Sequence, residues 1–230
     1  MLAEVKVLDK GYVRYLDSMG TDLSNCNDAY ASFERASATF GGRQGRLLHF
    51  LADRNETAPF RHAVLKLGIK APLMVARQLY KYSVACCQRE DQLAWSEVSR
   101  RYVTGEPEFY TPSVWRSAPE SKKQGSGEPL SLVQQAICSG EYQQMLADAM
   151  AAYDGALGAG MAPEQARLFL PAYALYVSWH MTLRLAAVAH LLAERLPEDA
   201  QWETQQYAQA MRDIVSELFP VSTEALLKGP

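Results

Sequence analysis

Residues 70–102 read KAPLMVARQLYKYSVACCQREDQLAWSEVSRRY, the most informative stretch of the chain. Its first part, residues 71–82, has one proline at the start followed by apolar residues at helical spacing. Proline is tolerated in the first turn of a helix, because the missing N–H has no partner there in any case. The pattern therefore predicts a helix over residues 71–82, which carries Gln78 and Lys81. The stretch ends in SEVSRRY, residues 96–102, whose dense polar side chains are typical of a loop that binds a polar ligand.

The segments before this stretch predict both strands and helices. An alternating run at residues 5–8, closed by an Asp-Lys-Gly turn, predicts an edge strand. The β-rich run at residues 62–69 predicts a strand that leads directly into the helix. A capping residue within residues 20–23 predicts a helix that runs to about residue 31. A further helix is expected at residues 43–51, after two glycines.

The second half of the chain has a helical pattern. Apolar spacing and helix breakers predict a series of helices, at residues 132–159, 161–170, 172–195 and 200–219, the last ended by Pro220. Residues 172–195 are almost wholly apolar, so we expect this helix to be buried, and a subunit interface is one place that would bury it. Strands early in the chain and helices later predict an α+β fold with a small sheet and long helices. The length predicts a single domain, residues 1–230.

The composition is that of an ordinary globular protein, with 48% hydrophobic and 21% charged residues and a formal net charge of −3. This weak acidity gives no electrostatic footprint for nucleic acid, so no nucleic-acid partner is expected. The N-terminus lacks the pattern of a signal peptide and no apolar run is long enough to cross a bilayer, so no membrane association is expected. Four cysteines without metal-ligand spacing favour a reducing compartment, hence the cytoplasm, and predict no metal site.

Several separated segments resemble motifs of the flavin-dependent thymidylate synthases. KAPLMVARQ followed by SEVSRRY looks like the centre of that family. The other matching segments, in the family's order, are VKVLDKGYVRYLDSMGTDLS, ETAPFRH, ARLFLPAYALY and AQWETQQYA. The resemblance implies the family's fold and its reaction, the C5-methylation of a uridylate (dUMP, UMP or both) with FAD, NADPH and methylenetetrahydrofolate. It also implies a homotetramer whose active sites are built from several subunits.

The hallmark motif of the family is altered in this chain. In the family an arginine–histidine–arginine triplet holds the flavin, and these positions fall here on Lys81, Tyr82 and Ser83. An insertion follows before the SEVSRRY segment. The flavin half of the site is therefore expected to differ from the family, whereas the substrate half resembles it.

The resemblance places the cofactor on a set of polar, aromatic and cationic residues: Ser32, Thr57, Lys81, Tyr82, Ser83, Glu97, Arg184 and His190. Another flavin-contacting position of the family falls on Ala186. Lys81 keeps a positive charge, but as a point donor without the fork of arginine. An arginine in an apolar segment is costly without a partner, so Arg184 is expected to meet a phosphate or an acidic side chain. His190 either contacts the flavin ring or is an ordinary hydrogen-bonded histidine of an apolar helix.

On the nucleotide side, the motif positions match the family, and the expected substrate-binding residues are Gln78, Glu97, Ser99, Arg101, Arg167 and Arg195. Arginine makes forked, charge-assisted hydrogen bonds to phosphate, and Arg101 and Arg167 are the candidates for phosphate and base contacts, with Arg195 as a third for the uracil. Gln78 offers a donor and an acceptor to a pyrimidine edge. Ser99, on the phosphate, and Arg195 are the expected catalytic residues. Without the motifs, each arginine would be taken for an ordinary surface or ion-paired residue.

FAD-dependent C5-methylation is thus the leading interpretation, with alternatives left open by the altered triplet. One branch of relatives with altered motifs methylates UMP in nucleoside-antibiotic formation. A second interpretation is another C5 modification, such as hydroxymethyl transfer, with Cys86 or Cys87 as a thiolate nucleophile. A third is a nucleotide-binding homologue without catalysis. The cysteine pair lies in the insertion, without a basic residue at an established distance, which favours inert thiols.

Overall fold

The fold is organised around an antiparallel sheet in the strand order β1-β2-β3-β5-β4. The structure is a computed structural model, and it describes residues 3–82, 95–98, 106–119 and 125–228. The strands are β1 (Glu4–Val7), β2 (Gly11–Met19), β3 (Val64–Pro72), β4 (Trp95–Glu97) and β5 (Tyr176–Arg184). β3 and β5 pair along their full length, with Val64 opposite Arg184 and Pro72 opposite Tyr176. Segments far apart in the sequence therefore form the middle of the sheet.

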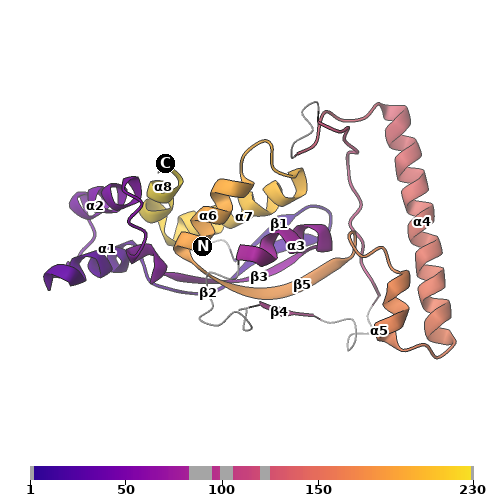
Figure 1. The fold of residues 1–230 in the computed structure, drawn as a ribbon, viewed down its shortest axis with the longest axis horizontal. Coiled ribbons are helices and arrows are strands. Elements are labelled where there is room, and N and C mark those ends of the chain that lie inside the picture. Colours follow the sequence, from indigo (N-terminus) through magenta and orange to yellow (C-terminus); the bar gives the residue numbers. More distant parts are fainter. Residues whose placement is uncertain (1–2, 83–94, 99–105, 120–124, 229–230) are drawn as a thin grey trace.

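Alternation along the two middle strands gives the sheet one apolar and one polar face. Leu65, Leu67 and Ile69 of β3 are fully buried, whereas Lys66 between them is exposed. Their partners on β5 are also buried, and these are Leu183, Met181 and Trp179. Helices α3 (Leu73–Tyr80), α6 (Leu185–Arg195) and α7 (Trp202–Leu218) cover the apolar face (Figure 1). The main core lies between these helices and the sheet.

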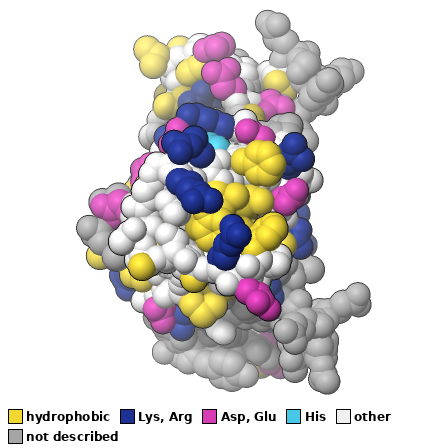
Figure 2. Space-filling view, turned by 90° about the vertical axis from the view of Figure 1, so that its left-hand side faces the viewer, with side chains coloured by type: hydrophobic (Ala, Val, Ile, Leu, Met, Phe, Trp, Pro, Cys, Tyr) yellow, Lys and Arg dark blue, Asp and Glu magenta, His cyan; other side chains and the backbone are white. Residues whose placement is uncertain are grey.

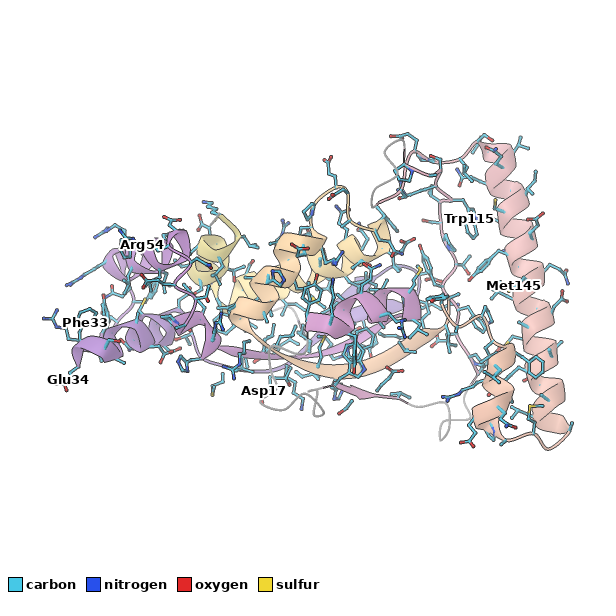
Figure 3. The ribbon with its side chains drawn as sticks, in the orientation of Figure 1. Asp17, Phe33, Glu34, Arg54, Trp115 and Met145 are labelled. Atoms are coloured by element: carbon cyan, nitrogen blue, oxygen red, sulfur yellow. The ribbon has the colours of Figure 1, made fainter. Side chains whose placement is uncertain are left out.

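Further helices lie at the two ends of the molecule (Figure 1). One end holds α1 (Asp22–Tyr30), α2 (Gly42–Asp53) and α8 (Pro220–Lys228), and the other holds α4 (Leu132–Gly158) and α5 (Pro163–Ala166). Short 3₁₀ turns accompany them: η1 (Ala31–Phe33), η2 (Pro59–Arg61) and η4 (Arg167–Phe169). In Figure 3, Phe33 and Arg54 mark the first end, and Trp115 and Met145 mark the second. Among the described residues, no helix is both long enough and apolar enough to cross a membrane.

Much of the predicted secondary structure is confirmed. The strand at residues 5–8 corresponds to β1, and the helices expected at residues 43–51 and 132–159 correspond to α2 and α4. The helix ending near residue 31 is α1, which Thr21 caps in a reciprocal capping box with Ser24. The α+β class with a small sheet and long helices is confirmed. The single-domain assignment stays a prediction.

The predicted helix over residues 172–195 is wrong. Its middle forms the strand β5, and only Leu185–Arg195 is helical, as α6. Side chains along β5 alternate, with Trp179 and Met181 buried and His180 between them exposed. Aromatic and β-branched residues favour strands, and here β3 and β4 supply backbone partners on both sides of β5. The apolar character of this segment thus comes from its place at the centre of the sheet.

Other boundaries also differ from the predictions. The helix expected at residues 71–82 begins only at Leu73, because Pro72 is its N-cap and Ala71 still pairs within β3. Residues 161–170 form the single turn of α5 followed by η4, not one continuous helix. The strands β2 and β4 have no counterpart in the predictions. The pairing of β2 with β3 shifts in register between Tyr15 and Asp17. This shift interrupts the alternation of apolar and polar residues from which a strand is predicted.

Pro220 begins a helix instead of only ending one. α7 ends at Leu218, and Pro220 is the first residue of α8, where its missing N–H costs nothing. The N–H groups of Val221 and Ser222 donate to the two carboxylate oxygens of Asp22, at 2.8 and 2.9 Å. Asp22 is buried in the first turn of α1, so a residue near the N-terminus caps the C-terminal helix.

The substitution Asp22→Ala is expected to destabilise the protein by about 2–4 kcal/mol, because two N–H groups lose charge-assisted partners. Denaturant unfolding measures this loss. The neighbouring Thr21→Ala removes only the local cap of α1 and is the matched control, with an expected cost of about 1 kcal/mol. Equal, small losses for both variants would contradict the long-range cap.

Candidate functional site

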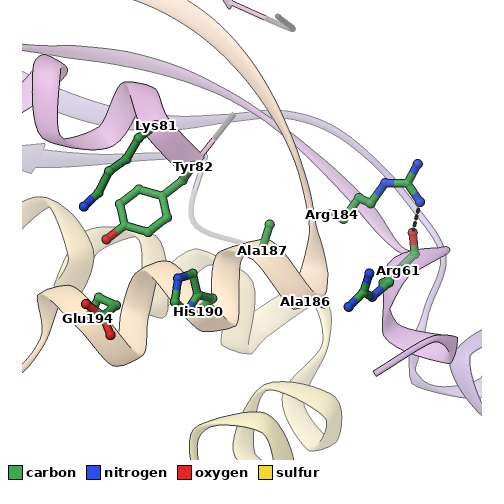
Figure 4. Close-up of a pocket in the computed structure, with 8 residues that line it drawn as sticks. All are labelled: Arg61, Lys81, Tyr82, Arg184, Ala186, Ala187, His190 and Glu194. Atoms are coloured by element: carbon green, nitrogen blue, oxygen red, sulfur yellow. Dashed lines mark hydrogen bonds between the residues drawn. The ribbon is translucent and has the colours of Figure 1, made fainter. Parts of the chain in front are cut away.

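A cavity of about 550 Å³ lies between the end of α3 and helix α6, a size typical of small-molecule sites (Figure 4). Its lining residues are Arg61, Lys81, Tyr82, Arg184, Ala186, Ala187, His190 and Glu194. Lys81 and Tyr82 follow α3 on one side, and His190 and Glu194 lie along α6 opposite them. Three Lys and Arg side chains stand against one carboxylate, so the cavity favours an anionic ligand.

Tyr82 connects the two sides of this cavity. Its side chain is buried, and its ring meets the ring of His190 edge to face, with centroids 5.7 Å apart. The ammonium of Lys81 lies 5.3 Å from the centre of the Tyr82 ring. The hydroxyl of Tyr82 accepts a hydrogen bond of 2.9 Å from Nε of Arg195. The residue that replaces the family's histidine therefore anchors a buried arginine.

Arg195 is a buried cation whose protein partners leave its charge largely uncompensated. It is only 8% exposed, and among the described residues its one hydrogen bond goes to the neutral phenol of Tyr82. Its place in the last turn of α6 favours a positive charge through the helix dipole, but by about 1 kcal/mol at most in ordinary surface settings. A buried charge without an anionic partner is costly. Arg195 is therefore suited to meet a polar or anionic ligand.

Arg61 and Arg184 form the other end of the cavity. Nη1 of Arg184 donates to the backbone carbonyl of Arg61 at 3.1 Å (Figure 4). Nε and Nη2 of Arg61 both donate to Oγ1 of Thr57, at 3.2 and 3.1 Å. Arg184 stands where β5 ends and α6 begins, so the strand-to-helix junction positions it. These contacts hold two guanidinium groups beside the cavity.

A second cavity, of about 930 Å³, adjoins the first at Arg61, which lines both. Its apolar walls come from α1, α2 and the turns after them and include Tyr30, Leu47 and Phe50. The hydroxyls of Ser32 and Thr57 also line it. Figure 2 shows this end of the molecule, where hydrophobic side chains gather and Lys and Arg side chains surround them. Apolar walls beside hydroxyls and guanidinium groups suit a ligand with both a flat apolar part and a phosphate part.

The structure brings most of the expected cofactor-binding residues together. Lys81, Tyr82, Arg184 and His190 line the first cavity, and Ser32 and Thr57 line the second. Arg184 stands at the end of a strand, not inside the helix expected at residues 172–195. Arg184 is expected to meet a phosphate or an acidic side chain, and its Nη1 donates to the backbone carbonyl of Arg61.

Other expected site residues lie elsewhere in the chain. Glu97 is exposed on β4, at the edge of the sheet, and accepts a hydrogen bond from Nε1 of Trp95 at 3.1 Å. Arg167 is exposed in η4, beside α4, where its Nε donates to the backbone carbonyl of Glu164 at 3.1 Å. Gln78 is half-buried on α3, where its Nε2 donates to Oε1 of Gln201, and it lines neither of the two cavities. Ser83, Ser99 and Arg101 lie outside the described residues.

The sequence interpretation misses two charged residues of the first cavity, Arg61 and Glu194. Arg61 is part of the ETAPFRH segment, and a basic residue between an apolar turn and a strand is a signal that could have identified it. Glu194 precedes Arg195 on α6, and no pattern in the sequence distinguishes it from a surface carboxylate. Its contribution is visible only from the packing of α6 against the end of α3.

The described cysteines offer no thiolate nucleophile at this site. Burial raises the pKa of the Cys26 thiol to about 11, so it stays protonated at neutral pH. Cys138 lies on α4, away from the two cavities. Cys86 and Cys87 lie outside the described residues, so the interpretation with a nucleophilic cysteine in the insertion stays a hypothesis.

Comparison with known proteins assigns the chain to a family. The family described as "Thymidylate synthase complementing protein" matches residues 16–221. The chain belongs to this family. Its members similar to this chain include the "Flavin-dependent thymidylate synthase" of Thermus thermophilus, 34% identical over 229 residues, which cover 98% of this chain and 80% of the relative. The protein of that name from Kosmotoga olearia is 31% identical, over 97% of this chain and 93% of the relative.

Solved structures with a similar fold support the same family assignment. The UMP/dUMP methylase PolB from Streptomyces cacaoi, bound with 5-Br dUMP, matches with a TM-score of 0.79 and 25% identity, over 98% of each chain. The same enzyme bound with 5-Br UMP matches with a TM-score of 0.78 and 24% identity. The predicted family and its fold are thereby confirmed, and so is the class of enzyme, a methyltransferase.

Proposed function

We propose that this thymidylate synthase family member methylates C5 of dUMP, UMP or both, with FAD bound, NADPH as reductant and methylenetetrahydrofolate as carbon donor. Support comes from the family match over residues 16–221 and from the likeness to a UMP/dUMP methylase that binds 5-bromo uridylates. One observation carries the proposal. Arg195 is a buried cation with only a neutral protein partner, next to a cavity rich in positive charge.

The two adjoining cavities fit a flavin dinucleotide in their donor chemistry. A flavin dinucleotide has flat rings and a diphosphate, and the cavities offer aromatic and aliphatic walls together with guanidinium, ammonium and hydroxyl donors. Lys81, Arg61 and Arg184 would hold the charged part, with Thr57 and Ser32 as hydroxyl donors. The chemistry that FAD supplies when bound is the transfer of electrons from NADPH to the new carbon unit.

The uridylate is assigned to the residues around Arg195. Arg195 would orient the uracil from its place beside Tyr82. Gln78, on α3, is assigned to the pyrimidine edge by its motif position. We propose that Ser99, Arg101 and Arg167 bind the phosphate and that Glu97 contacts the ribose or the cofactor. The protein's part in the reaction is then to hold the pyrimidine in one orientation and to exclude water around C5.

We further propose a homotetramer with shared sites. Within one chain, Glu97 at the sheet edge and Arg167 beside α4 are placed apart from the cavity lined by Lys81 and His190. If all of them act on one nucleotide, more than one subunit must contribute to each site. Sedimentation or light scattering, with and without dUMP, measures the state directly.

The test of the proposed function is tritium release from C5-labelled dUMP and, in parallel, from UMP, with FAD, NADPH and methylenetetrahydrofolate each omitted in turn. Release that requires all three supports the methylase, and the preferred nucleotide separates the two substrates. The product mass distinguishes a methyl group from a hydroxymethyl group, which carries one more oxygen. No release from either nucleotide, while nucleotide still binds, would favour a non-catalytic homologue.

Arg61→Ala is expected to weaken FAD binding by about 10- to 100-fold, because a guanidinium held by Thr57 would no longer face the phosphates. Flavin fluorescence titration measures this affinity. Arg43→Ala, on the exposed surface of α2, removes the same charge outside both cavities and is the matched control. Equal affinities for the two variants would contradict a cofactor at this junction.

A further inference from the structure

A third cavity, of about 370 Å³, lies where α4, the start of α7 and residues 110–116 meet, near Trp115 in Figure 3. It shares no described lining residue with the two cavities above, and none of the residues assigned to the cofactor or the uridylate lines it. Its volume is within the range of small-molecule sites. Four aromatic side chains line it, so we name it the aromatic cavity: Tyr110, Trp115, Tyr142 and Tyr173.

The polar ends of three of these rings are already bound to the protein. The hydroxyl of Tyr142 donates to the backbone carbonyl of Tyr110 at 2.6 Å, and Nε1 of Trp115 donates to Oγ of Ser139 at 2.9 Å. The hydroxyl of Tyr110 donates to Glu203 at 3.3 Å. The rings of Trp115 and Tyr142 meet at 74°, with centroids 5.5 Å apart, and so form two walls of a corner. These aromatic residues therefore offer a ligand ring surface instead of hydrogen-bonding groups.

Glu203 is the carboxylate of the aromatic cavity, and it is half-buried. Oε2 of Glu203 accepts from Nε2 of Gln201 at 2.9 Å, and Oε1 accepts from Tyr110. Among the described residues, no lysine, arginine or histidine forms an ion pair with it. A carboxylate has about four acceptor positions, so each oxygen can accept one more hydrogen bond. Its place in the first turn of α7 favours a negative charge through the helix dipole.

The other polar groups at the wall of this cavity have protein partners. The oxygen of the Gln201 amide accepts from Gln78, and its nitrogen donates to Glu203 and meets the sulfur of Met74. The guanidinium of Arg116 lies over the ring of Trp202, 5.4 Å from its centroid, and Trp202 is not a lining residue. Glu203 is therefore the charged group best placed to meet a ligand, and its charge selects a cation.

We propose that the aromatic cavity binds a small organic amine, with its ammonium on Glu203 and its apolar body against the rings of Trp115 and Tyr142. Carboxylates and aromatic faces both attract ammonium groups, whereas an anion would be repelled by both. Tyr173 is 68% exposed, so this side of the cavity opens to solvent. The proposal goes beyond the proposed function and does not rest on it, because the two involve different cavities.

The test is calorimetric titration of the full-length protein with three probes that share a phenyl ring. Phenethylamine carries the ammonium alone, 3-phenylpropionate carries a carboxylate alone, and phenylalanine carries both. Phenethylamine is expected to bind with a dissociation constant at or below about 1 mM, the scale for a ligand of this size, and 3-phenylpropionate at least about tenfold more weakly. Phenylalanine should also bind more weakly than phenethylamine, because its carboxylate enters a cavity that holds Glu203.

Glu203→Gln keeps the shape of the side chain and removes its charge. It is expected to weaken phenethylamine binding by about 10- to 100-fold, since a charge-assisted hydrogen bond is lost. Glu198→Gln, an exposed carboxylate outside the cavity and shortly before α7, is the matched control and should bind phenethylamine like the wild-type protein.

Tyr173→Leu keeps the test informative if the Glu203 variant does not fold. The side chain of Tyr173 is exposed, so the substitution leaves the core intact. Loss of one aromatic face is expected to weaken phenethylamine binding by about 3- to 10-fold. Phe40→Leu removes an exposed ring outside the cavity and is the control. Circular dichroism establishes that each variant is folded.

Weaker binding of phenethylamine in both variants, with both controls unchanged, supports the amine site. Absence of phenethylamine binding to the wild-type protein overturns it, as does unchanged affinity in the folded variants, which would place the amine elsewhere. Binding of phenylalanine or 3-phenylpropionate in preference to phenethylamine also overturns it, because Arg116 would then take a carboxylate. None of these outcomes bears on uridylate methylation, which tritium release tests separately.

Discussion

Replacing Arg195 with methionine is expected to lower kcat/KM for uridylate methylation by at least about 100-fold while leaving the protein equally or more stable. Removing one side of a buried, hydrogen-bonded charged contact with a ligand typically costs about 2–5 kcal/mol of binding. In the ligand-free protein, by contrast, the same substitution is not expected to lower the free energy of unfolding. Arg195 is buried with only a phenol as hydrogen-bond partner, so an apolar side chain of similar length relieves an uncompensated charge.

Tyr82→Phe provides the contrast to this variant. It keeps the buried guanidinium and removes the hydroxyl that accepts from it at 2.9 Å, so it should destabilise the protein by about 1–3 kcal/mol. Thermal unfolding and steady-state kinetics on both variants measure the two effects. Arg212→Met, at an exposed position on α7, is the control for loss of an arginine. Full activity in the Arg195→Met variant would contradict a role of Arg195 in substrate binding, on which the proposed function depends.

Trp179→Ala is expected to destabilise the protein by about 3–5 kcal/mol, the typical cost of emptying a large buried aromatic site. Trp179 is 1% exposed at the centre of β5, opposite Ile69 of β3. Its ring also stacks on Trp95 of β4, with centroids 4.5 Å apart. The substitution therefore weakens the middle of the sheet and its edge together. The melting temperature should fall on the order of 10 °C.

The milder Trp179→Phe tests whether packing causes this loss. Nε1 of Trp179 is buried and has no hydrogen-bond partner among the described residues, so phenylalanine loses area but no hydrogen bond. Its cost should be well below that of the alanine variant. Trp202→Ala, at a half-buried position in α7, should also cost less. A loss in the phenylalanine variant as large as in the alanine variant would mean that the indole N–H has a partner after all.

Local signals were sufficient for much of the fold. Thr21 caps α1 within the segment where the sequence predicts a capping residue, and the apolar face of α2 is buried at Leu48 and Leu51. The error over residues 172–195 has a physical cause. A continuous apolar run is compatible with a buried helix and with a central strand, and the choice depends on whether hydrogen-bonding partners flank it. Those partners, β3 and β4, come from distant parts of the chain.

For the site, the motifs indicated which residues to consider but not how they are grouped. Lys81 and His190 are far apart in sequence and line one cavity, because α3 and α6 pack on the same face of the sheet. Arg167, also carried by a motif, lies beside α4 instead. No local sequence pattern predicts which of these residues share a cavity, because that depends on how the strands and helices pack together.

By itself, the sequence determined the family, the α+β class and the chemical character of the site residues, because motifs, caps and composition are local properties of the chain. Only the tertiary structure decided the hydrogen-bond partners. It pairs Tyr82 with Arg195, Asp22 with the start of α8, and Gln78 with Gln201. Each of these contacts joins segments distant in sequence, and the energy of a buried charge or amide depends on the partner that packing brings to it.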